Sequence, residues 1–269
     1  NDGLKDWEEV LWKTDPKNLD TDEDGTQDGE EVSLGRNPLV PGPKDLLPKV
    51  NTPTTNTVDG DLTLTDKFAR DFFAIYASQK ALGKTPDPNL EKTLIDNFLQ
   101  SNLDVKNKIV YGISDIRVGK DTTEKALKAY GNNIGVILIK YGNIMTVADT
   151  LLVVKNSMES GNKKELEKLN SLILSYRGVV SDLLLLNVPS ILISEHLDFI
   201  NNAQALVEDA EEMKYIFDDP IKSLIHLRRY VYTSSTKTFE SIQKIKVFFS
   251  SHGITFQQEE SGYVLISNI

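Results

Sequence analysis

The sequence contains no cysteine, only three histidines and no long apolar run. The absence of cysteine excludes disulfide bonds, thiolate metal sites and cysteine catalysis. A membrane-spanning helix needs about 18 to 20 consecutive apolar residues, and no stretch of this chain has them. Lysine and arginine form no cluster or stripe that could neutralise phosphates, so the sequence predicts no nucleic-acid partner.

The acidic residues of the chain are concentrated at its start. Residues 1–31 hold twelve acids and three bases, whereas the whole chain holds 40 acids and 30 bases and has a net charge of −10. The remainder of the chain is therefore nearly neutral. This local excess indicates ion ligands rather than an acidic surface for basic partners.

The most informative pattern is a twelve-residue acidic loop over residues 20–31, with the sequence DTDEDGTQDGEE. It places side-chain oxygens at positions one, three, five, nine and twelve, and glycine at position six, which is the ligand spacing of a calcium loop. Because calcium takes six to eight oxygen ligands, we predict a main Ca²⁺ site here; the alternative is a solvated acidic turn that binds nothing. The predicted ligands are Asp20, Asp22, Asp24, the carbonyl of Thr26, Asp28 and Glu31.

A second, incomplete copy of this pattern precedes the loop by 22 residues. The shift aligns Asp2 with Asp24 and Pro16 with Pro38, so the module is an internal repeat. The first copy retains the later ligand positions but lacks positions one and three. We expect these in a longer parent protein, and a weak or empty first site in this fragment. The predicted ligands of this partial first site are Asp2, the carbonyl of Leu4, Asp6 and Glu9.

The repeat does not read as a complete EF-hand, because Pro16 and Asn18 oppose a helix entering the loop. Only an exiting turn is predicted, from about Asp28 to Leu34, with Gly35 ending it. The acidic loop followed by Glu-Glu-Val and Leu-Gly-Arg-Asn-Pro resembles the thrombospondin type 3-like calcium repeats of bacterial surface and secreted proteins, over residues 1–40. That resemblance implies calcium ligation by the loop carboxylates and a spacer role. A dockerin-like docking module, which also uses a duplicated calcium loop, is the alternative.

We predict three parts: a calcium-binding repeat module over residues 1–40, a proline- and threonine-rich linker over residues 41–61, and a helical domain over residues 62–269. Five of the ten prolines fall between Arg36 and Gly60, which favours an extended, semi-rigid segment. The fold class is mainly α, with a multi-helix bundle and a short C-terminal β-hairpin over residues 254–266.

The spacing of apolar residues predicts the helices of the helical domain, residues 62–269. Thr63 with Asp66, and Asp121 with Glu124, are predicted capping boxes, and Pro88 is a predicted first helical residue. The segment 109–118 is uncertain and could be extended. The expected helices span about residues 63–79, 87–99, 121–141, 144–158, 163–186, 189–217, 220–233 and 236–252.

No catalytic site is predicted. His196, beside Glu195 and Asp198, is a candidate general base, but a surface or core-edge histidine is the preferred interpretation. His226 and His252 stand in no metal-binding frame. An acidic run could hold a metal, and a solvated helix face is the preferred reading. This run comprises Glu208, Asp209, Glu211, Glu212, Asp218 and Asp219.

These patterns favour a calcium-stabilised, non-enzymatic protein of the cell surface or extracellular space, since calcium loops of this kind bind in the range of about 10⁻⁴–10⁻³ M found outside cells. The repeats would form a stalk, and the helical domain would bind another surface protein or a second copy of itself. No signal peptide is visible, so we expect an export signal or anchor upstream. The alternative is an exported enzyme whose active site in the helical domain is not recognisable; ionisable groups converging in a pocket would favour it, and an exposed apolar patch would favour a binding module.

Overall fold

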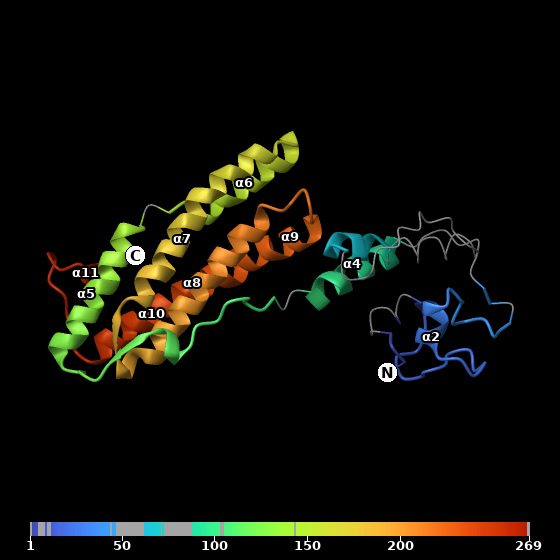
Figure 1. Ribbon diagram of the computed structural model, residues 1–269, viewed down its shortest axis with the longest axis horizontal. Helices are drawn as coiled ribbons and strands as arrows, with labels where there is room; N and C mark the ends of the chain where they lie inside the picture. Colours follow the sequence, from blue (N-terminus) through green and yellow to red (C-terminus); the bar gives the residue numbers. More distant parts are fainter. Residues whose placement is uncertain are drawn as a thin grey trace. The chain divides into compact units, whose positions relative to one another are not determined.

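The computed structural model describes residues 2–4, 9, 12–43, 45–46, 62–70, 72, 88–102, 105–142 and 144–267. The protein is mainly helical, as predicted (Figure 1). It divides into two compact units, Asn1–Asp104 and Val105–Ile269. The predicted boundaries of module, linker and helical domain stay a prediction, because most of residues 41–61 lie outside the described residues. No helix within the described ranges is both long and apolar enough to span a membrane.

In the first unit, the acidic loop leads into one short helix, α2 (Asp28–Ser33). The chain leaves α2 through Gly35, whose φ of +69° is a left-handed conformation that glycine adopts without strain. The predicted exiting turn and its end are thus confirmed. Residues 36–46 then fold back on themselves, with an antiparallel bridge between Arg36 and Leu46. This return brings the residues after the repeat to the acidic loop.

The first unit also contains helical residues 64–70 and helix α4 (Pro88–Asn102). The predicted capping box is confirmed, since the Thr63 hydroxyl accepts from the Asp66 N–H at 3.0 Å and the Asp66 carboxylate accepts from the Thr63 N–H at 3.1 Å. Helix α4 begins at Pro88 as expected. The Phe68 ring packs on Phe98 with centroids 4.7 Å apart. Several of the apolar residues whose spacing predicts these two helices lie outside the described side chains: Ile75, Tyr76, Leu90, Leu94 and Leu99.

The second unit is a helical bundle organised around its longest described helix, α8 (Ile193–Met213). Helix α8 packs against α7 (Leu169–Leu184), α9 (Pro220–Arg229) and α10 (Ser235–Ser251). Helices α5 (Glu124–Lys140) and α6 (Val147–Ser160) precede them. Figure 1 shows α7, α8 and α10 running side by side. Phe199, Ile200 and Ala203 of α8 are buried in the core, as the apolar periodicity requires.

Several helix boundaries differ from the predicted ones. Thr123, rather than Asp121, is the N-cap of α5, because the Asp121 carboxylate accepts from the N–H of Thr123. The predicted helix over residues 163–186 is divided into a 3-10 segment, Lys163–Lys168, and α7. The predicted break after Thr233 is absent, since a π-helical turn, Tyr230–Ser234, joins α9 to α10. Local sequence predicts helix at these places but not the type of turn.

A short parallel sheet pairs β1 (Arg117–Gly119) with β2 (Asn187–Pro189), with Val118 opposite Val188. The uncertain segment 109–118 thus contributes a 3-10 turn, Ile113–Asp115, and the first part of β1. Before these, residues 105–111 run as an extended strap along α8. The strap is held by side chains of α8: the Asn201 carboxamide bonds both the N–H and the C=O of Tyr111, at 2.8 and 3.0 Å.

The predicted C-terminal hairpin is wrong. Residues 254–262 form no strand, and a one-turn helix, α11 (Tyr263–Ile266), follows them. The apolar side chains of Ile254, Phe256 and Leu265 enter the core instead. The glycines of α5 make this possible, because a Cβ on Gly135 would lie 2.0 Å from the carbonyl oxygen of Ser261. A short apolar run does not distinguish a strand from a segment that packs on a helix.

Candidate metal centre

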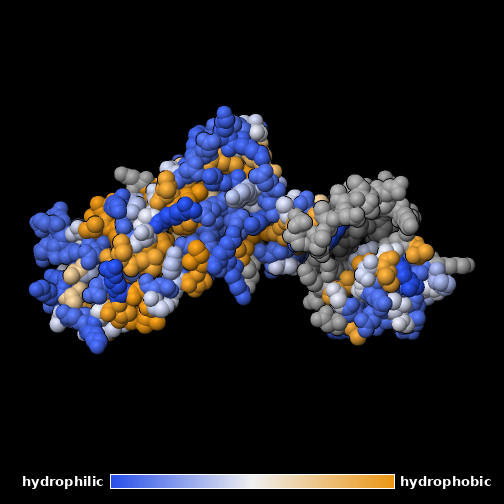
Figure 2. Space-filling view, viewed as in Figure 1, coloured by the Kyte–Doolittle hydropathy of each residue, from blue (hydrophilic) through white to orange (hydrophobic). Residues whose placement is uncertain are grey.

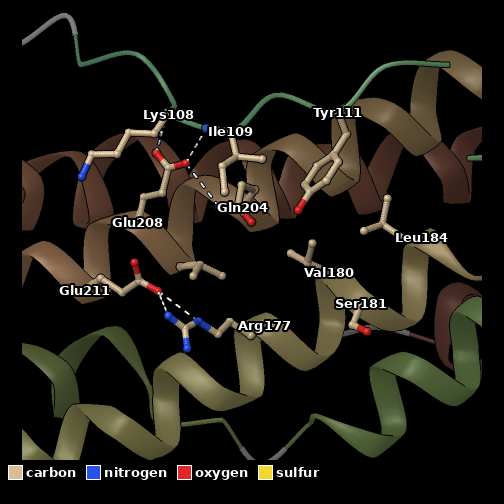
Figure 3. A pocket seen from close by; sticks show the side chains of 11 residues that line it. Lys108, Ile109, Tyr111, Arg177, Val180, Ser181, Leu184, Gln204, Glu208 and Glu211 are labelled. Carbon is tan, nitrogen blue, oxygen red and sulfur yellow. Dashed lines mark hydrogen bonds and ion pairs between the residues drawn. The ribbon is translucent and has the colours of Figure 1, made fainter. Parts of the chain in front are cut away.

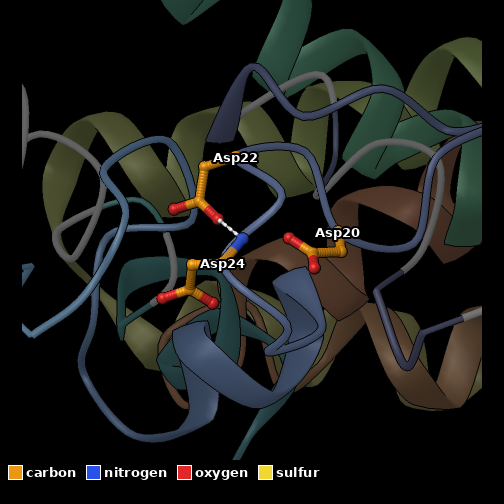
Figure 4. Close-up of side chains that lie close together, drawn as sticks. All are labelled: Asp20, Asp22 and Asp24. Carbon is orange, nitrogen blue, oxygen red and sulfur yellow. Dashed lines mark hydrogen bonds between the residues drawn. The ribbon is translucent and has the colours of Figure 1, made fainter.

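The acidic loop brings three carboxylates to one point. Oxygens of Asp20, Asp22 and Asp24 lie within 4.8 Å of one another (Figure 4). Each of these side chains accepts a hydrogen bond from a loop N–H: Asp20 from Gly25 at 2.8 Å, Asp22 from Asp24 at 3.1 Å, and Asp24 from Thr26 at 2.8 Å. Gly25 has a φ of +96°, so the sharp bend at position six depends on glycine. Hydrogen bonds from main-chain N–H groups therefore hold these three carboxylates in place without a bound ion.

Four carboxylate oxygens of this loop are buried without a hydrogen-bond donor. They are Oδ1 of Asp20, Oδ2 of Asp22 and both Oε atoms of Glu31. Buried polar atoms in folded proteins are nearly always hydrogen-bonded, and anionic ones have the greatest need of a partner. Since a bound cation would compensate such oxygens, and oxygen is the ligand that calcium prefers, the donor set fits calcium.

The electrostatics of the loop also favour a cation. Glu31 is fully buried, and burial together with the negative charges of Asp22 and Asp24 raises its pKa to about 7. Burial and the neighbouring aspartates likewise raise the pKa of Asp22. Hydrogen bonds from the N–H groups of Gly42 and Thr26 lower the pKa of Asp24. A divalent ion bound among these groups would favour the ionised form of Glu31 and so lower its pKa.

The predicted ligand Asp28 is bound elsewhere. Its two carboxylate oxygens accept from the N–H and the hydroxyl of Thr21, both at 2.7 Å, and the side chain is fully buried. Asp28 therefore ties the start of α2 to the loop. Thr26 donates its N–H to Asp24, and Glu31 of α2 lies close to Asp24. The ligand roles of all six residues stay predictions.

Sequence analysis missed Asp45. Oxygens of Asp24, Glu31 and Asp45 form a second group within 4.8 Å of one another. The return of residues 36–46 positions Asp45: the Asn37 N–H donates to the Asp45 carbonyl at 2.9 Å, and the Gly42 N–H donates to Asp24 Oδ2 at 2.7 Å. Asp45 lies beyond the twelve-residue pattern in a proline-containing segment, so no spacing rule finds it.

The partial first site is close to the complete one. Asp2 is buried, with one oxygen accepting from the Leu4 N–H at 3.0 Å and the other without a donor. Glu9 is also buried, whereas Asp6 lies outside the described residues. A Cβ on Gly29 would lie 2.2 Å from the carbonyl oxygen of Asp2, so the two repeats are in main-chain contact.

In the second unit, the candidate base His196 is a core residue. It is fully buried, its Nδ1 lies 2.9 Å from the Tyr130 hydroxyl, and burial lowers its pKa to about 4. Asp198, its proposed neighbour, instead pairs with Lys244 at 2.7 Å on the surface. The preferred prediction of a surface or core-edge position is wrong, because α5 and α8 enclose the imidazole.

The acidic run is only in part the solvated face that was predicted: Asp218 is exposed and Glu211 is half-buried, whereas the other four acids are buried. Asp209 is fully buried and accepts from Arg229 Nε at 2.5 Å and from the Ser234 hydroxyl at 2.7 Å, while His226 Nδ1 lies 2.8 Å away. Glu208 and Glu212 are also buried. Cations from α9 and from the strap neutralise this run, and the sequence of α8 alone contains no sign of them. Of the described residues, those in acidic groups compact enough to share an ion all lie between Asp20 and Asp45.

A pocket of about 370 Å³ lies between the strap, α7 and α8 (Figure 3). Its charged side chains are paired: Arg177 with Glu211 at 2.5 Å, and Lys108 with Glu212 at 2.5 Å. Glu208 accepts from the N–H groups of Lys108 and Ile109, at 2.9 and 3.0 Å. These charges therefore hold the strap on α8.

A larger groove of about 620 Å³ is almost entirely apolar. Leu152 and Met158 of α6 are about half exposed there, at 52% and 47%. Figure 2 shows further apolar patches on the visible face of the second unit. The groove is lined by Ala148, Leu151, Leu152, Val154, Lys155, Met158, Glu159 and Leu227.

Comparison with known proteins assigns only the first part of the chain. A family model described as the bacterial TSP3 repeat matches residues 1–18 and 20–41. Residues 1–41 are therefore bacterial TSP3 repeats, which confirms the resemblance of the acidic loop and its flanking motif. No curated protein matches the chain. No solved structure matches it either.

Proposed function

We propose that residues 1–46 bind calcium through the acidic loop and form a rigid module of a bacterial protein that works at the cell surface or outside the cell. The single observation that carries this proposal is the set of four buried carboxylate oxygens, on Asp20, Asp22 and Glu31, that lack a hydrogen-bond donor. The match to bacterial TSP3 repeats, which typically bind Ca²⁺, supports the same ion.

The bound ion would supply positive charge at the point where the loop, α2 and the returning segment meet. Asp20, Asp22 and Asp24 come from the loop and Glu31 comes from α2, while Asp45 of the returning segment lies beside Asp24 and Glu31. Hydrogen bonds from loop N–H groups hold the carboxylates of Asp20, Asp22 and Asp24 in place. Without a cation, the mutual repulsion of these carboxylates destabilises the module, since two unit charges about 4 Å apart repel by roughly 4 kcal/mol at an effective dielectric constant near 20. Calcium would therefore act as a structural ion that stiffens a stalk.

For the second unit, we propose a role in binding or assembly, with another surface protein or a second copy of the chain as partner. The supporting observation is the apolar groove beside α6, because exposed apolar concavities of this size commonly mark sites of interaction. The enzyme alternative has less support, since the charged side chains of the pocket under the strap are engaged in ion pairs. A dockerin-like docking role for the repeats differs in requiring a partner for residues 1–41.

Isothermal titration of the whole chain with calcium chloride tests the calcium proposal. Glu31→Gln should weaken calcium binding at least tenfold, because the substitution removes a buried charged ligand. Glu30→Gln is the matched control, since Glu30 is the adjacent acid and is exposed on α2. Equal heats for both variants and the native chain would refute the assigned site. Binding of a protein partner by residues 1–41 would instead favour the docking alternative.

A further inference from the structure

The two acidic groups of the first unit differ in what neutralises them. In the group of Asp20, Asp22 and Asp24, the oxygens without donors belong to Asp20 and Asp22, and in the group of Asp24, Glu31 and Asp45 they belong to Glu31. This second group shares Asp24 with the first group and is more enclosed, because Glu31 and Asp45 are 0% and 3% exposed. Asp24 therefore stands between two positions at which positive charge is needed.

A guanidinium already pairs with two of the three carboxylates of the second group, those of Asp24 and Asp45. Arg36 Nη2 lies 3.6 Å from Asp24 Oδ2, and Arg36 Nε donates to Asp45 Oδ2. The backbone of Arg36 is fixed on both sides, by donation of its N–H to the Glu31 carbonyl at 2.8 Å and by its bridge to Leu46. A Cβ on Gly42 would lie 2.2 Å from Arg36 Nη2, so the glycine leaves room for the guanidinium.

We propose that Arg36 is a built-in cation of the module, standing where a second divalent ion would otherwise share Asp24, Glu31 and Asp45. A guanidinium stays charged at every physiological pH and donates in fixed directions to carboxylates, so it can replace a metal ion as a structural charge. A divalent ion beside it would meet like charge. The complete repeat therefore binds one calcium ion at the first group, and Glu31 reaches that ion from the second group. This inference rests on the proposed calcium binding.

Native mass spectrometry of the whole chain in calcium chloride tests the proposal by counting bound ions. Arg36→Gln removes the guanidinium, and the chain should then bind one ion more than the native chain. The double variant Arg36→Gln, Asp45→Asn should return to the native count. Since each result is a difference between chains, ions bound elsewhere cancel. An unchanged count in Arg36→Gln would overturn the proposal.

If Arg36→Gln destabilises the fold, two further variants still test the proposal. Asp45→Asn in the native background should leave the ion count unchanged, and loss of one ion would overturn the proposal by showing that Asp45 already holds a metal. Arg36→Lys keeps a positive charge and should keep the native count, whereas a gain of one ion would contradict the role of the charge. Absence of bound calcium from every chain would refute the calcium module itself, and this inference with it.

Discussion

Glu31 is buried among like charges, and neither of its carboxylate oxygens has a hydrogen-bond donor. Its pKa of about 7 lies above the ordinary value of 4.5, so the metal-free fold binds a proton there more tightly than the unfolded chain does. In the absence of metal, the stability contributed by this group is therefore present below pH 4.5 and is lost as the pH rises through 7. Bound calcium has the opposite effect, because it favours the carboxylate.

This proton linkage predicts the pH dependence of calcium affinity. Below pH 7, calcium must displace one proton from Glu31, so the dissociation constant should rise about tenfold between pH 8 and pH 6. Titration calorimetry in buffers of different ionisation enthalpy measures the proton release directly. In Glu31→Gln the pH dependence over this range should disappear, and its persistence there would assign the proton to another group.

At the scale of single elements, two glycines of α5 allow the C-terminal segment to pack closely against the helix. Gly131 and Gly135 weaken a helix by intrinsic propensity, since glycine costs about 1 kcal/mol relative to alanine. In this protein they face the C-terminal segment, and a Cβ on Gly131 would lie 2.4 Å from the ring of Phe256. The Gly262 N–H also donates to the Asn132 carboxamide at 2.8 Å. These contacts hold α11 and the segment before it on α5.

Gly135→Ala should lower the free energy of unfolding of the second unit by about 1–3 kcal/mol, because the new methyl group would overlap the main chain of Ser261. Gly112→Ala is the control, since the nearest atom to a Cβ there is 3.9 Å away and the backbone φ is −120°. Urea denaturation of both variants measures the difference. A Gly135→Ala protein as stable as the native one would show that the C-terminal segment does not pack tightly on α5.

The contact between α8 and α9 includes a buried ion pair of Asp209 and Arg229. Arg229→Met should destabilise the second unit by about 3–5 kcal/mol, because it leaves the Asp209 carboxylate buried without its charged partner. Lys163→Met removes an exposed pair with Asp218 and should leave the urea midpoint nearly unchanged. Equal midpoints for the two variants would mean that His226 and Ser234 satisfy Asp209 without the arginine.

At the scale of the whole molecule, calcium should affect the two units differently. Its proposed ligands all belong to the first unit. The core of the second unit is formed by apolar side chains, and its described residues include no acidic group that could share an ion. Stability in proteins is distributed over units that open separately when few contacts link them.

Chelation should therefore raise the hydrogen-exchange rates of amides in the loop, α2 and residues 36–46, while those of α7, α8 and α10 keep their protection. Exchange followed by mass spectrometry with and without EDTA makes this measurement. Re-addition of calcium chloride is the control and should restore the protection. Loss of protection in both units together would show that they unfold as one.

The sequence by itself determined the position of the calcium loop and the helical class of the rest. All predicted ligands of the main site fall within twelve consecutive residues, where spacing alone decides which side chains can turn to one point. The spacing of apolar residues likewise identified the helices of the second unit. Gly35 marked the end of α2 and Pro88 the start of α4, because these signals are local to the chain.

Only the tertiary structure decided what surrounds those elements. Asp45 and Arg36 meet the loop because the chain folds back, the acids of α8 are buried because Arg229 and the strap neutralise them, and Phe256 enters the core because α5 has no side chains at two positions. Each of these outcomes depends on residues far apart in sequence. Their energies arise from desolvation and close contact between segments, which no local pattern encodes.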